Sequence, residues 1–216
     1  EAAGYLAPQE QAIKVLPIDN AKFLQGQRFD FAIEIKNGDT NMDVKVNGQD
    51  AAKFFGKTAT KSMEGTTAVY RIDDVSFPKA GNITINVKNG ANERAAKYVV
   101  TNAKAKKTAK NVILFVGDGM SLQAREIARI LSKGITEGKY NDLLNMEKLD
   151  NMAVITTSGY DSIVTDSANS AAAYATGHKS VVNAMGIYEN CTKDPLDDPK
   201  VENIIELAKR TRGMAT

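Results

Sequence analysis

Asp166 and Ser167 are the residues of this 216-residue chain whose types and placement could do chemistry together. They open an alanine-rich segment that is predicted to be a loop and then a helix between Thr165 and Thr176, with its end at Gly177. The N-terminus of a helix presents unpaired backbone N–H groups and a positive dipole end, which stabilise an alkoxide or a phosphate oxyanion. The same position also favours residues that cap the helix, so the pair could serve only as a cap.

A nucleophilic role for Ser167 requires a group that activates its hydroxyl. The sequence has one histidine, His178, which lies near the far end of the predicted helix, and it has no Gly-x-Ser-x-Gly turn. A serine-hydrolase triad is therefore not expected. A bound metal ion is the better candidate for lowering the pKa of the Ser167 hydroxyl. The small residues that follow Ser167 leave room for a substrate beside the helix end.

Asp118 is the second candidate, because it follows a continuous apolar run, "NVILFV", and stands between Gly117 and Gly119. Such a run is typical of a strand buried on both faces of a parallel sheet. Functional groups gather at the carboxyl ends of strands in open α/β sheets, and a carboxylate is a natural ligand for a hard metal ion. Gly-Asp-Gly is also an ordinary turn sequence, so both interpretations of Asp118 stay open at this point.

The segments around these residues alternate between strand and helix patterns, which predicts an α/β region over 111–216. The second buried strand is expected at 152–158. One helix is predicted to begin at Ser121, and a later one to begin with Asp198 as its cap and to end at Gly213. The residues expected to face the core from these two helices are Ala124, Ile127, Ala128, Leu131, Val201, Ile204, Ile205 and Ala208.

The first hundred residues have a different pattern, in which apolar residues alternate with polar ones and a turn signal recurs every 8–12 residues. Phe29, Phe31, Ile33 and Ile35 share one face of such a strand, and Asn47-Gly48 marks a turn after Val44 and Val46. We predict an all-β sandwich of immunoglobulin-like shape over 1–103, with a packing or spacer role. The lysine-rich residues 104–110 are then predicted to form a linker to the α/β region at 111–216.

The composition excludes several classes of function. The net charge of +2 gives no reason to expect nucleic acid as a partner, and no apolar run is long enough to cross a membrane. The single cysteine, Cys191, cannot form a disulfide within the chain, and the single histidine cannot complete a zinc site made of several imidazoles. Two predicted parallel strands are too few for a closed core, so we expect the chain to be the N-terminal part of a longer protein.

Three stretches of the sequence resemble the bacterial alkaline phosphatase family. They are "KNVILFVGDGM" at 110–120, "VTDSANSAAAYATGHKSVVNAMG" at 164–186 and "VENIIELAKRTRGMAT" at 201–216. The sandwich resembles the Ig-like extension carried by some bacterial members. The resemblance implies that Ser167 is the nucleophile and becomes phosphoserine, that Asp118 binds one zinc and the neighbouring magnesium, and that Ser167 Oγ binds the same zinc. It also implies that Asp166 orients an arginine that binds phosphate.

The family resemblance implies an enzyme, a phosphoric monoester hydrolase with two zinc ions and one magnesium ion. Most of the metal ligands are expected beyond residue 216, so the remainder of the same protein is an expected partner and the isolated chain is expected to be inactive. A phosphomonoester substrate, a possible homodimer and a periplasmic or secreted location are implied by the family as well. His178 and Cys191 match none of its functional positions, and His178 is expected to be a core or helix-end residue.

Three alternatives compete with this function. A sulfatase would need Pro and Arg where this chain has Asn169 and Ala171, which argues against it. A phosphodiesterase of the same superfamily usually carries threonine in place of Ser167. The third alternative, from a different class, is a non-catalytic fragment that binds a partner through its sandwich.

Overall fold

The computed structural model describes residues 12–102 and 110–216. The chain divides into two compact units. The first unit contains residues 1–105 and 158–216, and the second contains residues 106–157. The residues predicted to form the lysine-rich linker, 104–110, lie outside the described residues except for the last of them.

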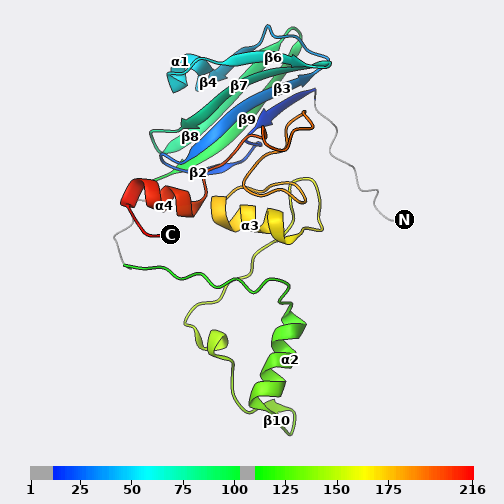
Figure 1. The fold of residues 1–216 in the computed structure, drawn as a ribbon, viewed down its shortest axis with the longest axis vertical. Helices are drawn as coiled ribbons and strands as arrows, with labels where there is room; N and C mark the ends of the chain where they lie inside the picture. The colour runs from blue at the N-terminus through cyan, green and yellow to red at the C-terminus, as the bar shows by residue number, and fades with distance from the viewer. Residues whose placement is uncertain (1–11, 103–109) are drawn as a thin grey trace, which may run out of the picture. The chain divides into compact units, whose positions relative to one another are not determined.

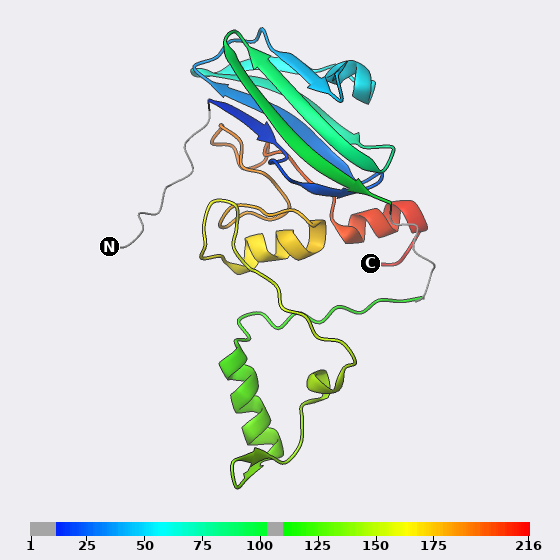
Figure 2. The same cartoon turned by 180° about the vertical axis from the view of Figure 1, so that it is seen from behind.

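A β-sandwich makes up most of the first unit (Figures 1 and 2). One sheet has the order β1-β3-β7-β6, with strands Ile13–Leu16, Arg28–Lys36, Thr67–Ser76 and Thr60–Glu64. The other has the order β2-β9-β8-β4-β5, with strands Lys22–Leu24, Asn92–Thr101, Gly81–Asn89, Asp43–Val46 and Gln49–Asp50. All pairings are antiparallel except that of β2 with β9, and a short helix, α1 (Ala51–Phe55), follows β5.

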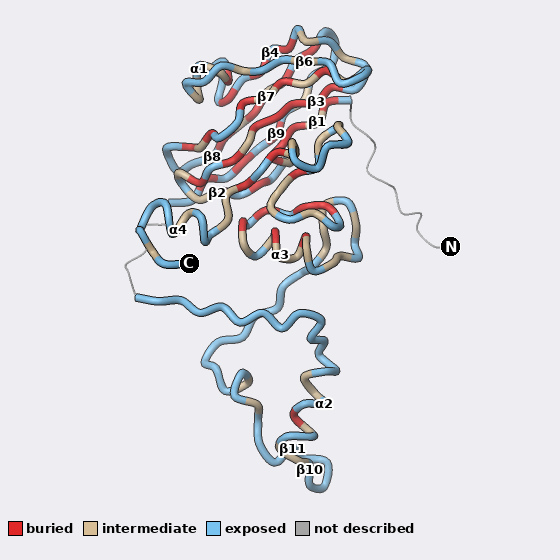
Figure 3. The backbone as a smooth tube through the Cα atoms, in the orientation of Figure 1, coloured by how far each residue is buried: buried red, intermediate tan, exposed pale blue. Residues whose placement is uncertain are grey.

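The alternating pattern of the sequence forms the core of the sandwich, as predicted (Figure 3). The four predicted residues of β3 are all buried, as are Val44 and Val46 of β4. The predicted turn at Asn47-Gly48 joins β4 to β5, and both of its residues have positive φ, as a two-residue hairpin turn of type I′ requires. Phe23 lies at the centre of an aromatic cluster, with its ring centroid 4.6 Å from that of Phe29 and 5.1 Å from that of Phe77.

Residues 158–216 of the first unit consist of irregular chain and two helices, α3 (Ser167–Thr176) and α4 (Ile204–Arg212). Helix α3 begins and ends where the sequence predicted, with Gly177 in the left-handed conformation at its C-terminus. Helix α4 ends at Gly213 as predicted, but its cap is Asn203. The predicted start at Asp198 is wrong, because the backbone of Lys200 and Val201 pairs with Ile187 and Phe29 as β-bridges.

The second unit contains α2 (Leu122–Lys133), the two-residue strands β10 (Ile135–Thr136) and β11 (Lys139–Tyr140), and the 3-10 helix η1 (Asn145–Lys148). The predicted start of α2 is confirmed, since Ser121 Oγ accepts a hydrogen bond from Ala124 N at 3.1 Å. Its best-buried side chain is Arg129, which forms a two-pronged ion pair with Glu147, whereas its predicted core residues Ile127 and Leu131 are exposed.

The two strands predicted at 111–116 and 152–158 do not form, and this expectation is corrected. Both segments lack strand pairing, and their apolar side chains are exposed, including Phe115 at 89% and Val154 at 93%. A strand needs a neighbour for its backbone hydrogen bonds, and the described part of the chain supplies none for either segment. The broader prediction is confirmed: a β-sandwich precedes a region in which the longer elements are helices.

None of the helices in the described ranges is long and apolar enough to cross a membrane.

Replacement of Phe31 by alanine tests the sandwich core. Phe31 is completely buried in β3, so Phe31→Ala should lower the free energy of unfolding by about 3–5 kcal/mol through lost burial and the cavity left behind. Urea unfolding followed by far-ultraviolet circular dichroism measures this change. The matched control is Val99→Ala in β9, where the side chain is 44% exposed and the change should stay within about 0.5 kcal/mol. Equal losses in the two variants would contradict the assigned core.

Candidate functional site

The N-terminus of α3 is held by Asp166, which forms a reciprocal cap with Asn169. Asp166 Oδ1 accepts a hydrogen bond from Asn169 N at 2.9 Å, and Asn169 Oδ1 accepts one from Asp166 N at 3.2 Å. The other oxygen, Asp166 Oδ2, accepts one from Asn183 N at 2.6 Å. These backbone donors, that of Asn169 first, hold the pKa of the Asp166 carboxyl below its usual range. The carboxylate therefore stays ionised and fixed at the helix end.

Ser167 is the first residue of α3, directly after this cap. It is exposed, and its hydroxyl has no hydrogen-bond partner within the part of the chain that the structure describes. The structure thus shows the capping role, because Asp166 caps the helix, and it leaves Ser167 Oγ without a partner among the described residues. A hydroxyl at the N-terminus of a helix, near the positive end of the helix dipole, is suited to attack an electrophile whose oxygens carry negative charge.

Asn169 is a residue of this site whose role in the helix cap was not predicted; from the sequence it counted only as a small residue and as an argument against a sulfatase. Its side chain is 2% exposed, and its Nδ2 has no hydrogen-bond partner among the described residues. The backbone of Gly159 packs closely against it, because a Cβ atom at Gly159 would lie 2.7 Å from Asn169 Nδ2. The spacing Asp-x-x-Asn, a variant of the capping box, was the signal in the sequence that could have identified it.

His178 is buried at the C-terminal end of α3, which confirms the prediction of a core residue. Its Nδ1 lies 2.7 Å from the hydroxyl of Tyr188, and its ring centroid lies 4.7 Å from that of Phe23 in the sandwich. Burial lowers the pKa of His178 to about 4, so the imidazole is neutral at physiological pH. Because the ring is buried, it is not accessible to a metal ion or a substrate.

Asp118 belongs to the second unit, whereas Asp166 and Ser167 belong to the first. It lies in a turn in which Met120 N donates to Gly117 O at 3.1 Å, and Gly119 has a φ of 67°. The Asp118 side chain is exposed. The turn and the exposed carboxylate are compatible with both interpretations of this residue, a metal ligand or an ordinary turn aspartate.

The donor atoms available for a metal ion are oxygens. The Asp118 carboxylate and the Ser167 hydroxyl are both exposed, and both suit magnesium or an oxygen position of a zinc site. Among residues 12–102 and 110–216, no three His, Cys, Asp or Glu side chains gather as a metal site would require. Each of these two oxygens has the chemistry of a metal ligand when it is considered by itself. Cys191 is an exposed free thiol and contributes to no such group.

Comparison with known families matches residues 109–216 to a family model described as "Alkaline phosphatase". Among curated proteins, the chain is 33% identical over 102 residues to the tissue-nonspecific alkaline phosphatase isozyme of Gallus gallus, covering 47% of this chain and 20% of that protein. It is 38% identical over 128 residues to alkaline phosphatase H of Pseudomonas aeruginosa, covering 57% of this chain and 25% of that protein. The chain thus spans a quarter or less of the length of these relatives.

Solved structures resemble the sandwich. The M1 domain of titin is 16% identical, with a TM-score of 0.24, over 41% of this chain and 91% of that one. An IG27 protein domain is 18% identical, with a TM-score of 0.28, over 42% of this chain and 94% of that one. The assignment of a two-sheet sandwich rests on the strand pairing itself.

Replacement of His178 by phenylalanine tests the buried neutral imidazole. In the unfolded chain His178 binds a proton near its ordinary pKa of about 6.5, whereas in the folded chain it does so only near 4. The unfolded state therefore binds more protons as the pH falls, and we expect this group to cost the wild type about 2 kcal/mol of stability between pH 7 and pH 5.

The measurement is urea unfolding of the wild type and of His178→Phe at both pH values. The variant should lose less stability than the wild type by about that amount. Identical losses in the two proteins would show that His178 is already protonated in the folded state, or is not buried.

Proposed function

Since this chain belongs to the alkaline phosphatase family, we propose that it hydrolyses phosphomonoesters as part of the complete protein, with Ser167 as the nucleophile. The observation that carries the proposal is the placement of Ser167, whose exposed hydroxyl has no partner among the described residues and directly follows the reciprocal cap of Asp166 and Asn169. The comparisons support the family, and the roles of individual residues are our proposal.

The proposed reaction has two displacement steps at phosphorus. Ser167 Oγ gives up its proton and forms a bond to phosphorus, while the bond from phosphorus to the ester oxygen breaks; the departing oxygen takes up a proton and leaves as the alcohol. Water then attacks the phosphoserine, releases inorganic phosphate and restores the hydroxyl. The positive end of the α3 dipole stabilises the negative charge of the phosphoryl oxygens in both steps. Asp166, held ionised by the backbone, is placed to orient a cationic side chain that binds phosphate.

Two zinc ions and one magnesium ion, implied by the family, would supply the positive charge that lowers the pKa of Ser167. In this chain Asp118 and Ser167 Oγ are the proposed ligands, and the remaining ligands are proposed to lie in the rest of the protein. For this reason we propose that the isolated 216-residue chain is inactive. The predicted boundaries at 1–103, 104–110 and 111–216, a homodimer and a periplasmic or secreted location also remain proposals.

Covalent trapping tests the nucleophile in the full-length gene product. Incubation with a radiolabelled phosphomonoester followed by acid quenching should leave label on the peptide that contains Ser167. In Ser167→Ala the label should disappear and the rate of p-nitrophenyl phosphate hydrolysis should fall by about 1,000-fold or more, the scale expected when a covalent nucleophile is removed.

The matched control is Ser170→Ala, which removes a hydroxyl from the same helix and should keep both the label and the activity. Label on another residue, or full activity in Ser167→Ala, would contradict the proposed function. Removal of metal ions by a chelator should also abolish the label, and zinc with magnesium should restore it.

A further inference from the structure

We infer that Gln27, in the turn between β2 and β3 of the sandwich, is a positioning residue for Ser167. It fixes the C-terminal end of α3 and thereby the place of the nucleophile at the other end. The effect of Gln27 on the reaction rests on the proposed function. The contacts of Gln27 with the helix are observed in the structure and do not depend on that function. Through Gln27, the sandwich helps to fix the position of helix α3, which carries Ser167.

Gln27 is 4% exposed and uses its whole amide group in hydrogen bonds. Its Nε2 donates to Thr176 O and to Glu202 O, both at 2.9 Å. Its Oε1 accepts from Leu24 N at 3.1 Å within the sandwich. A buried amide is stable only when its donors and acceptors are satisfied, so this side chain joins three backbone segments at fixed distances.

The contact at Thr176 satisfies a group that α3 cannot satisfy by itself. The last carbonyls of a helix have no intrahelical partner, and Thr176 is the last residue of α3. Thr176 is itself buried, its Oγ1 donates to Ala172 O at 2.6 Å, and His178 N donates to Thr176 Oγ1 at 3.0 Å. These hydrogen bonds fix the C-terminal turn of α3. Gln27 Nε2, which donates to Thr176 O, links this turn to the sandwich.

Glu202, the other contact of Gln27, is held by backbone pairing with β3. Glu202 N donates to Arg28 O at 2.9 Å, and Arg28 N donates to Glu202 Oε2 at 2.9 Å. The preceding residue, Val201, forms a β-bridge with Phe29 and belongs to the buried core of the sandwich. Gln27 thus joins α3 to a segment that already forms part of the sandwich.

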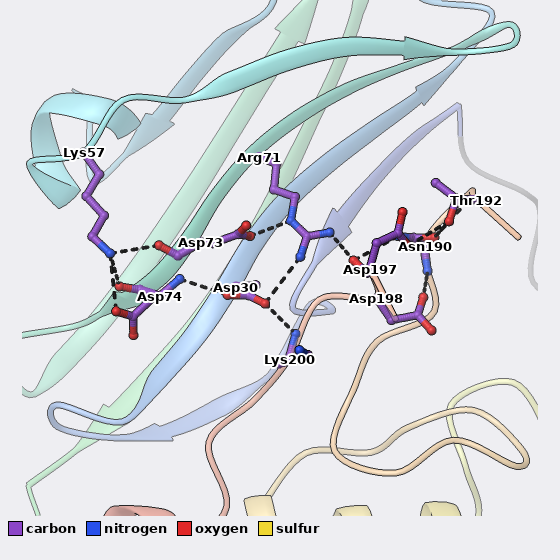
Figure 4. Close-up of polar contacts among 10 residues, drawn as sticks. All are labelled: Asp30, Lys57, Arg71, Asp73, Asp74, Asn190, Thr192, Asp197, Asp198 and Lys200. Atoms are coloured by element: carbon purple, nitrogen blue, oxygen red, sulfur yellow. Dashed lines mark hydrogen bonds and ion pairs between the residues drawn. The ribbon is translucent and has the colours of Figure 1, made fainter. Parts of the chain in front are cut away.

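A polar network forms a second tie between the sandwich and this segment (Figure 4). Asp30 Oδ2 accepts from Lys200 N at 2.9 Å, and Asp30 N donates to Lys200 O at 2.8 Å. The Arg71 guanidinium contacts the same carboxylate oxygen at 3.4 Å and donates to the carbonyl oxygen of Asp197. Asp197 in turn accepts a hydrogen bond from Asn190 Nδ2 at 2.6 Å. The anchor for Glu202 is therefore rigid.

The length of α3 makes its C-terminal contact relevant to Ser167. A helix from Ser167 to Thr176 is a stiff rod about 14 Å long, at a rise of about 1.5 Å per residue. Release of one end lets the rod tilt, which displaces the other end. A misplacement of about 1 Å at a reacting atom can reduce the rate about 100-fold. A hydrogen bond far from the nucleophile can therefore control its attack.

The test is Gln27→Met in the full-length gene product, because methionine keeps the length of the side chain and removes both donors. We expect kcat for p-nitrophenyl phosphate to fall by about 10-fold or more, with a change of less than about 3-fold in KM, since the attacking oxygen moves while other substrate contacts stay. Backbone amide hydrogen exchange in residues 167–176 should increase at the same time. If Gln27→Met does not fold, Gln27→Glu keeps the acceptor for Leu24 N, also loses the amide donors, and gives the same test.

Two controls separate positioning from a general loss of stability. Gln25→Met removes an exposed glutamine of the same turn, whose Nε2 donates to Pro78 O at 2.7 Å within the sandwich. Val44→Ala weakens the core at β4, whose sheet partners are β5 and β8. Both controls should keep kcat and the hydrogen exchange of α3 within about 2-fold of the wild type at temperatures below unfolding.

Unchanged exchange in α3 of Gln27→Met would overturn the inference, as would an equal fall of kcat in Val44→Ala. If the proposed function itself is wrong, the result differs, because the wild type then forms no phosphoserine. In that case the catalytic consequence is overturned as well, and the hydrogen-exchange comparison still decides whether Gln27 fixes the helix.

Discussion

The first unit depends on a hydrophobic core that two distant parts of the sequence share. Tyr188 and Val201 are buried in the same core as the strands of the sandwich, and the His178 ring lies against Phe23. Burial of apolar surface is non-directional, so it holds the segments together without fixing how they are oriented. The orientation comes from polar groups at the edge of this core, above all from the Gln27 amide, whose bonds have defined directions. Apolar contact and directional bonding together place α3.

The described residues of the second unit, 110–157, form no buried apolar core, and only locally stabilised elements form among them. Its helix α2 forms because local signals suffice, with a side-chain cap at Ser121 and the Arg129–Glu147 ion pair. Its apolar segments at 111–116 and 152–158 have no strand partner in the described part of the chain, and they stay irregular and exposed. A helix satisfies its backbone groups within itself, whereas a strand depends on another segment. The same region therefore contains a formed helix and unformed strands.

The same distinction explains how much could be predicted from the sequence. Local signals gave correct results: the alternation of β3, the turn at Asn47-Gly48 and both ends of α3. The predicted start of α4 was wrong. Asp198 and Pro199 form a good local signal for a helix start, but Val201 forms a β-bridge with Phe29 instead. Gln27 carried no signal at all, because its partners Thr176 and Glu202 become neighbours only in the folded chain. At the candidate site the cap was predictable from adjacent residues, and its support from the sandwich was not.

The division of roles between Asp166 and Ser167 arises from the effect of capping on a side chain. A capping oxygen accepts hydrogen bonds from the backbone, which lowers its basicity and fixes its direction, and the lowered pKa of Asp166 shows this effect. A hydroxyl in that position would have its lone pairs occupied and would be a poor nucleophile. With the carboxylate as the cap, the next residue lies at the same helix end, and its hydroxyl has no partner among the described residues. In the proposed reaction, the order Asp-Ser would therefore give Ser167 the benefit of the helix N-terminus without the hydrogen bonds of a cap.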